Sequence, residues 1–182
     1  MAQNAPPTAI LTEDEAWMYL PATTLSGWSP VRDTPRVRVD PGRAKVGFYG
    51  TLDLRTGREL VTRHQDLTAS TSASHLQLIL DTFPEVPILL FWDRAPWHHG
   101  QAIRTLLAAH PRLEIIEYPV AAAELNPQEQ VWKQSRRAIS HNHVCPKLPQ
   151  LADDFELHLT ANTFHSSFLH DYGFDLVCPF LN

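Results

Sequence analysis

Hydrophobic and polar positions along the chain predict several strands. Residues 10–19 are rich in apolar and aromatic side chains and predict one strand, and residues 46–54 predict another. A glycine-containing turn at 55–58 and a returning strand at 59–64 complete a predicted β-hairpin. The unbroken apolar run at 86–92 is typical of a strand that is buried on both faces of a sheet.

The period changes to that of a helix after the hairpin. Leu76, Leu80 and Phe83 lie on one face of a predicted helix, and Ser70 or Thr71 is expected to cap its start. The predicted helices are 71–83, 98–109, 127–140 and one within 148–168, and a further strand is predicted at 113–118. This order indicates an α/β fold, with a mixed sheet, an antiparallel hairpin and flanking helices on both faces. The order is similar to that of the ribonuclease H-like fold.

Composition is that of a globular protein, with 43% hydrophobic and 19% charged residues. The length of 182 residues suits one domain with a sizeable core. The longest apolar run is too short to span a bilayer, and the start of the chain does not resemble a signal peptide. Cys145 and Cys178 lack metal-site spacing, and we expect a reducing, cytoplasmic setting. From the short apolar runs we expect no membrane association.

The net charge of −5 argues against DNA binding by bulk charge. The basic residues are nevertheless grouped, in one stretch within 32–45 and in another that comprises Lys133, Arg136 and Arg137. Two interpretations stay open. These groups are either solvated basic surfaces, or they flank an acidic site and hold phosphates there.

Two aspartates occupy positions at which a charge requires a reason. Asp93 ends the buried apolar run, and ligand sites in open α/β sheets gather at the carboxyl ends of strands; the alternative is a turn aspartate that caps the next residues. Asp14 lies between Glu13 and Glu15 in a predicted strand, so its side chain points opposite to theirs. The alternative for Asp14 is a solvent-facing carboxylate on an edge strand.

Glu129 belongs to the start of a predicted helix. Asn126, Pro127 and Glu129 stand where a capping residue, a first-turn proline and a capping-box glutamate would stand. Glu129 alone is therefore explained as a helix-closing residue, or as an ion-pair partner of Lys133 four residues later. Taken together, however, the three carboxylates can converge on one point, and such oxygen donors suit Mg²⁺ or Mn²⁺.

Three motifs resemble those of DDE-superfamily transposases of the mariner-related insertion-sequence type. Asp14-Glu15 is similar to the first motif, Asp-x-Ala-Pro-Trp-His within 91–98 to the second, and Asn-Pro-x-Glu within 123–132 to the third. The spacing of 35 residues between Asp93 and Glu129 is similar to that of the superfamily, and 27–35 resembles its tryptophan-containing loop. The resemblance runs from about Leu11 to Arg137.

This resemblance implies a ribonuclease H-like catalytic domain that cleaves DNA at transposon ends and transfers the freed strand to target DNA. It implies that Asp14, Asp93 and Glu129 are catalytic and bind Mg²⁺ or Mn²⁺, with two ions expected. The expected partners are double-stranded DNA and a second copy of the chain. Residues expected to support the carboxylates or to contact DNA are His98, Asn126, Lys133, Arg136 and Arg137.

We expect a flexible leader at 1–8, the catalytic domain at 9–170 and a tail at 171–182, to which no role is assigned. The helix-turn-helix domains usual in such transposases are not expected within this sequence, and Val120 to Ala123 replaces a more polar segment. Two alternatives follow. The chain is a truncated, non-catalytic module that self-associates or regulates a full-length transposase, or it is another ribonuclease H-like nuclease.

Overall fold

The computed structural model describes residues 8–21, 23–26, 31–32, 43–120 and 122–164. The predicted leader, except for Thr8, and the predicted tail lie outside the described residues. Most of the tryptophan-containing loop predicted within 27–35 lies outside them as well.

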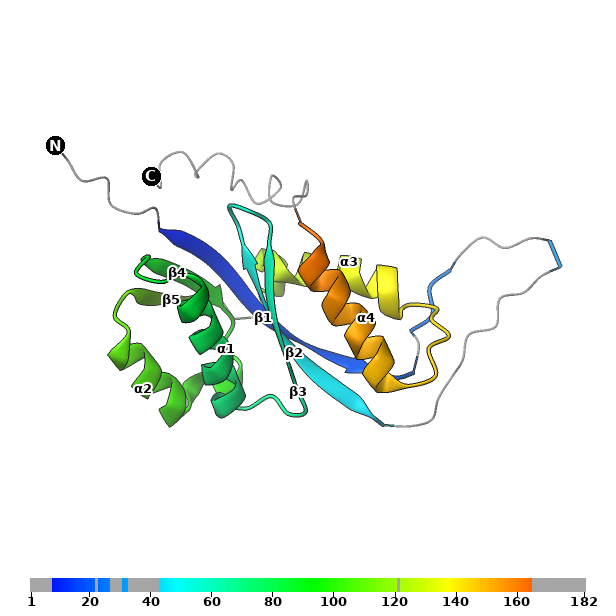
Figure 1. The fold of residues 1–182 in the computed structure, drawn as a ribbon, viewed down its shortest axis with the longest axis horizontal. Coiled ribbons are helices and arrows are strands. Elements are labelled where there is room, and N and C mark those ends of the chain that lie inside the picture. The colour runs from blue at the N-terminus through cyan, green and yellow to red at the C-terminus, as the bar shows by residue number, and fades with distance from the viewer. Residues whose placement is uncertain (1–7, 22, 27–30, 33–42, 121, 165–182) are drawn as a thin grey trace.

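Five strands form one mixed sheet in the order β3-β2-β1-β4-β5, with β1 at its centre (Figure 1). β1 pairs antiparallel with β2 and parallel with β4, and β2 and β3 form the predicted hairpin. The strands are β1 (Ala9–Tyr19), β2 (Lys45–Asp53), β3 (Glu59–His64), β4 (Ile88–Trp92) and β5 (Leu113–Glu117). The α-helices are α1 (Ala69–Thr82), α2 (Gln101–Ala109), α3 (Gln128–Ser135) and α4 (Leu148–Ala161), and the shorter turns are η1 (Pro96–His99), η2 (Ala123–Leu125) and η3 (Arg136–Ser140).

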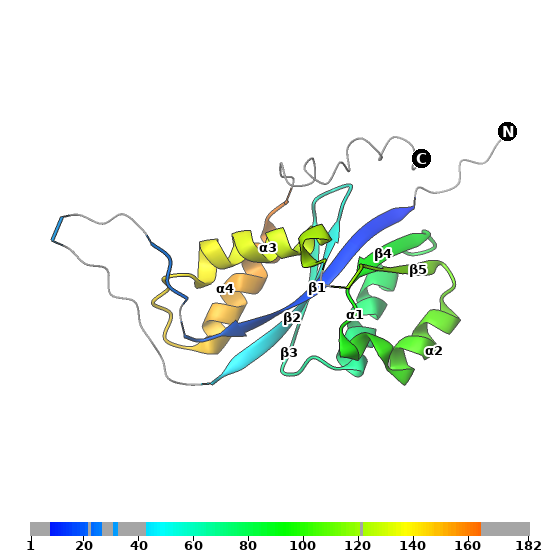
Figure 2. The same cartoon turned by 180° about the vertical axis from the view of Figure 1, so that it is seen from behind.

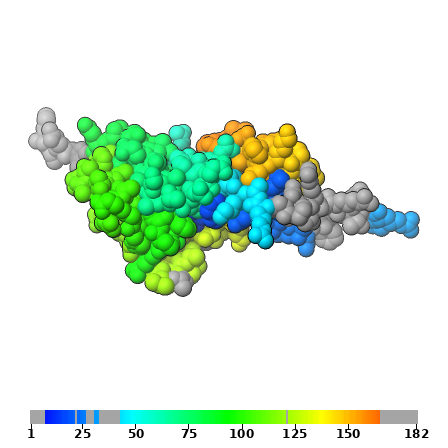
Figure 3. Space-filling view, turned by 90° about the horizontal axis from the view of Figure 1, so that it is seen from below, coloured from blue at the N-terminus to red at the C-terminus, as the bar shows by residue number. Residues whose placement is uncertain are grey.

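The helices cover opposite faces of the sheet, α1 and α2 on one and α3 and α4 on the other (Figure 2). Alternate residues of β1 supply each core, because successive side chains of a strand point to opposite faces. Ile10 and Ala16 pack in the core that includes Trp132 and Phe155, whereas Leu11 packs in the core with α1. In Figure 3 the strands lie between the green helices of one layer and the orange α4 of the other.

The predicted elements are confirmed with small shifts, and one detail is wrong. Thr68, rather than Ser70 or Thr71, is the N-cap of α1, and its hydroxyl accepts a hydrogen bond from the Thr71 amide. The Thr71 hydroxyl in turn accepts a hydrogen bond from the Thr68 amide, so Thr71 belongs to the same reciprocal cap. The capping pair therefore begins earlier than the apolar periodicity suggested.

The helix predicted at 98–109 is interrupted at Gly100, which separates η1 from α2 in an extended conformation. A Cβ at Gly100 would collide with Ala69, the first residue of α1. This close approach lets η1 pack beside α1. Within the described residues, no helix is long and apolar enough to cross a membrane.

Candidate carboxylate site

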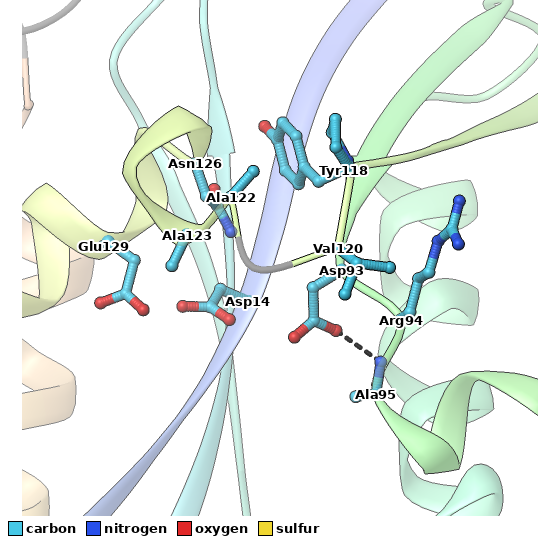
Figure 4. Close-up of a pocket in the computed structure, with 11 residues that line it drawn as sticks. Asp14, Asp93, Arg94, Ala95, Tyr118, Val120, Ala122, Ala123, Asn126 and Glu129 are labelled. Atoms are coloured by element: carbon cyan, nitrogen blue, oxygen red, sulfur yellow. Dashed lines mark hydrogen bonds between the residues drawn. The ribbon is translucent and has the colours of Figure 1, made fainter.

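Asp14, Asp93 and Glu129 line one cavity of about 260 Å³, beside the middle of β1 and the carboxyl end of β4. Figure 4 shows their side chains pointing into this cavity from β1, from the segment after β4 and from α3. We call this the carboxylate cavity. Its other lining residues are Arg94, Ala95, Tyr118, Pro119, Val120, Ala122, Ala123 and Asn126.

Asp14 is the most enclosed of the three carboxylates. It lies on the central strand and is only 8% exposed, and its Oδ2 accepts a hydrogen bond of 3.1 Å from the Trp132 indole. Burial raises the pKa of Asp14 well above its usual value, and the nearby carboxylates of Glu129 and Glu15 raise it further. The solvent-facing edge position considered for Asp14 is therefore excluded. A cation in the cavity would relieve this repulsion.

Asp93 follows Trp92, the last residue of β4. Its Oδ1 accepts a 2.7 Å hydrogen bond from the Ala95 amide, which is the turn-capping contact considered from the sequence. That contact does not exclude a second role, because the Asp93 side chain is 50% exposed and also faces the cavity. The capping bond fixes where the carboxylate points.

Glu129 lies in the first turn of α3, and the side chain of Asn126, just before the helix, bonds to this turn. The Asn126 Oδ1 accepts hydrogen bonds from the Gln128 amide at 3.1 Å and from the Thr12 hydroxyl at 2.6 Å. Its Nδ2 donates to the Glu13 carbonyl at 3.1 Å, so the start of α3 is tied to β1. Within the described residues, the Glu129 carboxylate forms neither a capping hydrogen bond nor an ion pair with Lys133. It lines the cavity instead.

The three carboxylates line the same cavity. Among the described residues, the group whose candidate ligand atoms all lie within 4.8 Å of one another comprises Glu13, Glu15 and His98, on the other face of β1.

A larger groove of about 950 Å³ opens beside the cavity and shares Ala123 and Glu129 with it. Lys133 and Arg136 line this groove, whereas Arg137 is exposed and lies outside its lining. The basic group in the C-terminal half of the chain therefore flanks the acidic site in part.

His98 and Trp132 have structural roles that the sequence did not specify. His98 is 3% exposed and contacts the Asp93 backbone, so its ring does not reach the surface. Trp132 is buried in the core, and its indole also donates a hydrogen bond to Asp14. The spacing of three residues between Glu129 and Trp132 places both on one face of α3, which is the signal that could have predicted this contact.

The sequence matches the family described as DDE superfamily endonuclease over residues 10–152. It is 25% identical over 144 residues to the insertion element IS630 uncharacterized 39 kDa protein of Shigella sonnei, covering 78% of this chain and 42% of that protein. The chain therefore spans less than half the length of this curated relative.

Solved structures of Mos1 transposase share the fold. The Mos1 mariner paired end complex with Mn has a TM-score of 0.65 at 17% identity, over 90% of this chain and 52% of that one. The catalytic domain of Mos1 mariner transposase has a TM-score of 0.61 at 13% identity, over 90% of this chain and 76% of that one. These likenesses confirm the ribonuclease H-like fold, and the family match shows that the chain belongs to the DDE superfamily endonucleases.

Proposed function

We propose that this chain is the catalytic domain of an insertion-sequence transposase, which cleaves and transfers DNA strands with divalent metal ions. The observation that carries the proposal is the convergence of Asp14, Asp93 and Glu129 on one cavity in a member of this endonuclease family. The proposed catalytic domain spans 9–170, with 1–8 and 171–182 outside it.

The donor set fits Mg²⁺ or Mn²⁺, because these hard cations prefer carboxylate oxygens. Asp14, Asp93 and Glu129 are the proposed ligands. When bound, two such ions supply an activated water or 3′-hydroxyl and stabilise the leaving oxygen of a phosphodiester. The chain's own contribution is orientation: Trp132 holds Asp14, the Ala95 amide holds Asp93, and Asn126 fixes the helix that carries Glu129.

Double-stranded DNA is the proposed partner, and the groove beside the cavity is its proposed path. Lys133 and Arg136 supply positive charge along the groove, and the ammonium of Lys45 lies 3.4 Å from the ring centroid of Trp17, another lining residue. Phosphate contacts of this kind orient DNA without reading its sequence. A second copy of the chain is proposed as a further partner, since two DNA ends must be joined.

The test is nicking of supercoiled plasmid DNA in Mg²⁺ or Mn²⁺, which requires no knowledge of the transposon ends. We expect metal-dependent nicking by the wild type and at least a hundredfold loss in Asp93→Asn and in Glu129→Gln. Asp154→Asn, an exposed aspartate of α4, is the matched control and should retain activity. Equal nicking by Asp93→Asn and the wild type would refute the assignment of the carboxylates.

Two other outcomes discriminate between the alternatives. Saturable Mn²⁺ binding that Asp93→Asn abolishes, without cleavage of any substrate, would replace the catalytic proposal with the regulatory module. Cleavage of RNA–DNA hybrids or junctions in preference to duplex DNA would instead indicate a different nuclease on the same fold.

A further inference from the structure

A second group of carboxylates lies behind the proposed catalytic site, on the face of the sheet that α1 covers. Glu13 and Glu15 flank Asp14 on β1 and point to the opposite side. Glu13 is only 1% exposed, and neither of its carboxylate oxygens has a hydrogen-bond partner among the described residues. Such an arrangement is unfavourable, because a buried carboxylate is normally hydrogen-bonded, paired with a charge or bound to a metal.

The ring of His98 presents a nitrogen to these two carboxylates. Its Nδ1 lies 3.0 Å from the carbonyl oxygen of Asp93, which can only accept, so Nδ1 carries a proton. In the neutral ring, Nε2 then offers a lone pair, and it lies 2.8 Å from the Glu15 Oε1 and 3.6 Å from the Glu13 Oε2. Three electron-pair donors thus face one another in a buried space. A cation at their centre would satisfy all three.

The ring is also fixed in place. It stacks on Trp92 with 4.0 Å between ring centroids and 3° between ring planes, and the Trp97 indole donates a hydrogen bond to the Glu15 carboxylate. Metal-binding histidines typically donate their other ring nitrogen to a carbonyl, and metal-binding carboxylates are themselves hydrogen-bonded. His98 and Glu15 meet both conditions.

The separations are close to those of a metal site. The candidate ligand atoms of Glu13, Glu15 and His98 all lie within 4.8 Å of one another. Bonds of about 2.0–2.1 Å in a tetrahedral site place ligands about 3.3 Å apart, between the 2.8 Å and 3.6 Å that separate Nε2 from the two carboxylates. Two carboxylates and one divalent ion also balance in charge, as burial favours.

We propose that Glu13, Glu15 and His98 bind one divalent transition-metal ion, with Zn²⁺ the best match to a nitrogen and two carboxylate oxygens. A proton on Nε2 explains these contacts less well than a metal ion does. The protonated Nε2 would pair with Glu15, but it lies 3.6 Å from the Glu13 Oε2 and would leave Glu13 without a hydrogen bond. The ion would join β1 to the segment after β4 and thereby hold the backbone of Asp93. Its role is structural, and the site is separate from the carboxylate cavity.

The test is titration of the whole chain with Co²⁺, which replaces Zn²⁺ and reports nitrogen and oxygen ligation by its visible absorption. The variants Glu13→Gln, which is isosteric, and His98→Gln are each added to the double variant Asp14→Asn/Asp93→Asn, in which the carboxylate cavity lacks two of its proposed ligands. We expect the double variant to bind one equivalent of Co²⁺, and we expect either added substitution to abolish this binding. Circular dichroism identifies a variant that fails to fold. If His98→Gln does not fold, the result for Glu13→Gln decides the test.

A second measurement is independent of any cobalt spectrum. Zn²⁺ should raise the melting temperature of the double variant, but not that of the double variant with Glu13→Gln added, because an ion that binds only the folded state stabilises it. An absence of saturable binding in the double variant would overturn the proposal, because the ion would then belong to the carboxylate cavity. So would binding that survives the addition of Glu13→Gln.

Discussion

Asn126 is the clearest test of how the fold positions the carboxylates. Its buried side chain makes three hydrogen bonds, to the Thr12 hydroxyl, the Glu13 carbonyl and the Gln128 amide. Asn126→Ala removes all three and leaves these groups in a site that is 3% exposed. At about 1 kcal/mol for each buried hydrogen bond, the expected loss in the free energy of unfolding is about 3 kcal/mol.

The assay is urea denaturation, followed by tryptophan fluorescence and by circular dichroism. With a slope of about 2 kcal/mol/M, the unfolding midpoint of Asn126→Ala should fall by about 1.5 M. Asn162→Ala is the matched control, because Asn162 is exposed and its amide donates only to His158 of the preceding turn. The control should lose less than about 1 kcal/mol.

Asn126→Asp separates the contributions. The aspartate keeps an oxygen for Thr12 and Gln128 but lacks the donor to the Glu13 carbonyl. Asn126→Asp should therefore also lower the free energy of unfolding measurably when no metal is added. The reasoning is refuted if Asn126→Ala and Asn162→Ala destabilise the chain equally. Asn126 would then have no special part in tying α3 to β1.

Three further predictions concern buried polar residues. Burial raises the pKa of Glu59, which favours its protonated form; the folded state therefore binds an extra proton, and stability falls as the pH rises above about 4.3. Glu59→Gln should remove this loss and be more stable than the wild type at pH 7 in urea denaturation, whereas a less stable variant would contradict the assignment. Burial lowers the pKa of His75 to about 3, and its two ring nitrogens lie 2.8 Å and 2.9 Å from the hydroxyls of Thr51 and Thr62. The unfolded state therefore binds the extra proton, so stability should fall by up to about 1.4 kcal/mol per pH unit as the pH drops below about 6.5. Acid titration of His75→Gln should show a smaller slope of stability against pH. An unchanged slope would exclude His75 as its cause. Gly50→Ala should lower the melting temperature by several degrees in calorimetry, because a Cβ would collide with Glu59, Gln128 and Trp132 beneath Asp14; an unchanged melting temperature would show that this packing is loose.

The sequence by itself determined the elements and the three carboxylates. The strand at Glu59–His64 agrees with its prediction, and the other elements shift by only a few residues, because strand and helix periods depend on neighbours in the chain. Asp93 was found from its place at the end of an apolar run, and Glu129 from its place beside Asn126. For Asp93 the local interpretation, a capping residue, matches a contact that the fold uses. For Glu129 it does not, because the side chain of Asn126 bonds the start of the helix instead.

Only the tertiary structure decided what surrounds these carboxylates. The Trp132 indole meets Asp14 from 118 residues away, and His98 meets Glu15 from 83 residues away. Glu13 and Glu15 looked like ordinary acidic neighbours of Asp14, and nothing local showed that α1 and η1 would bury them. Hydrogen bonds and burial of this kind arise when separate elements pack together, so periodicity within one segment does not encode them.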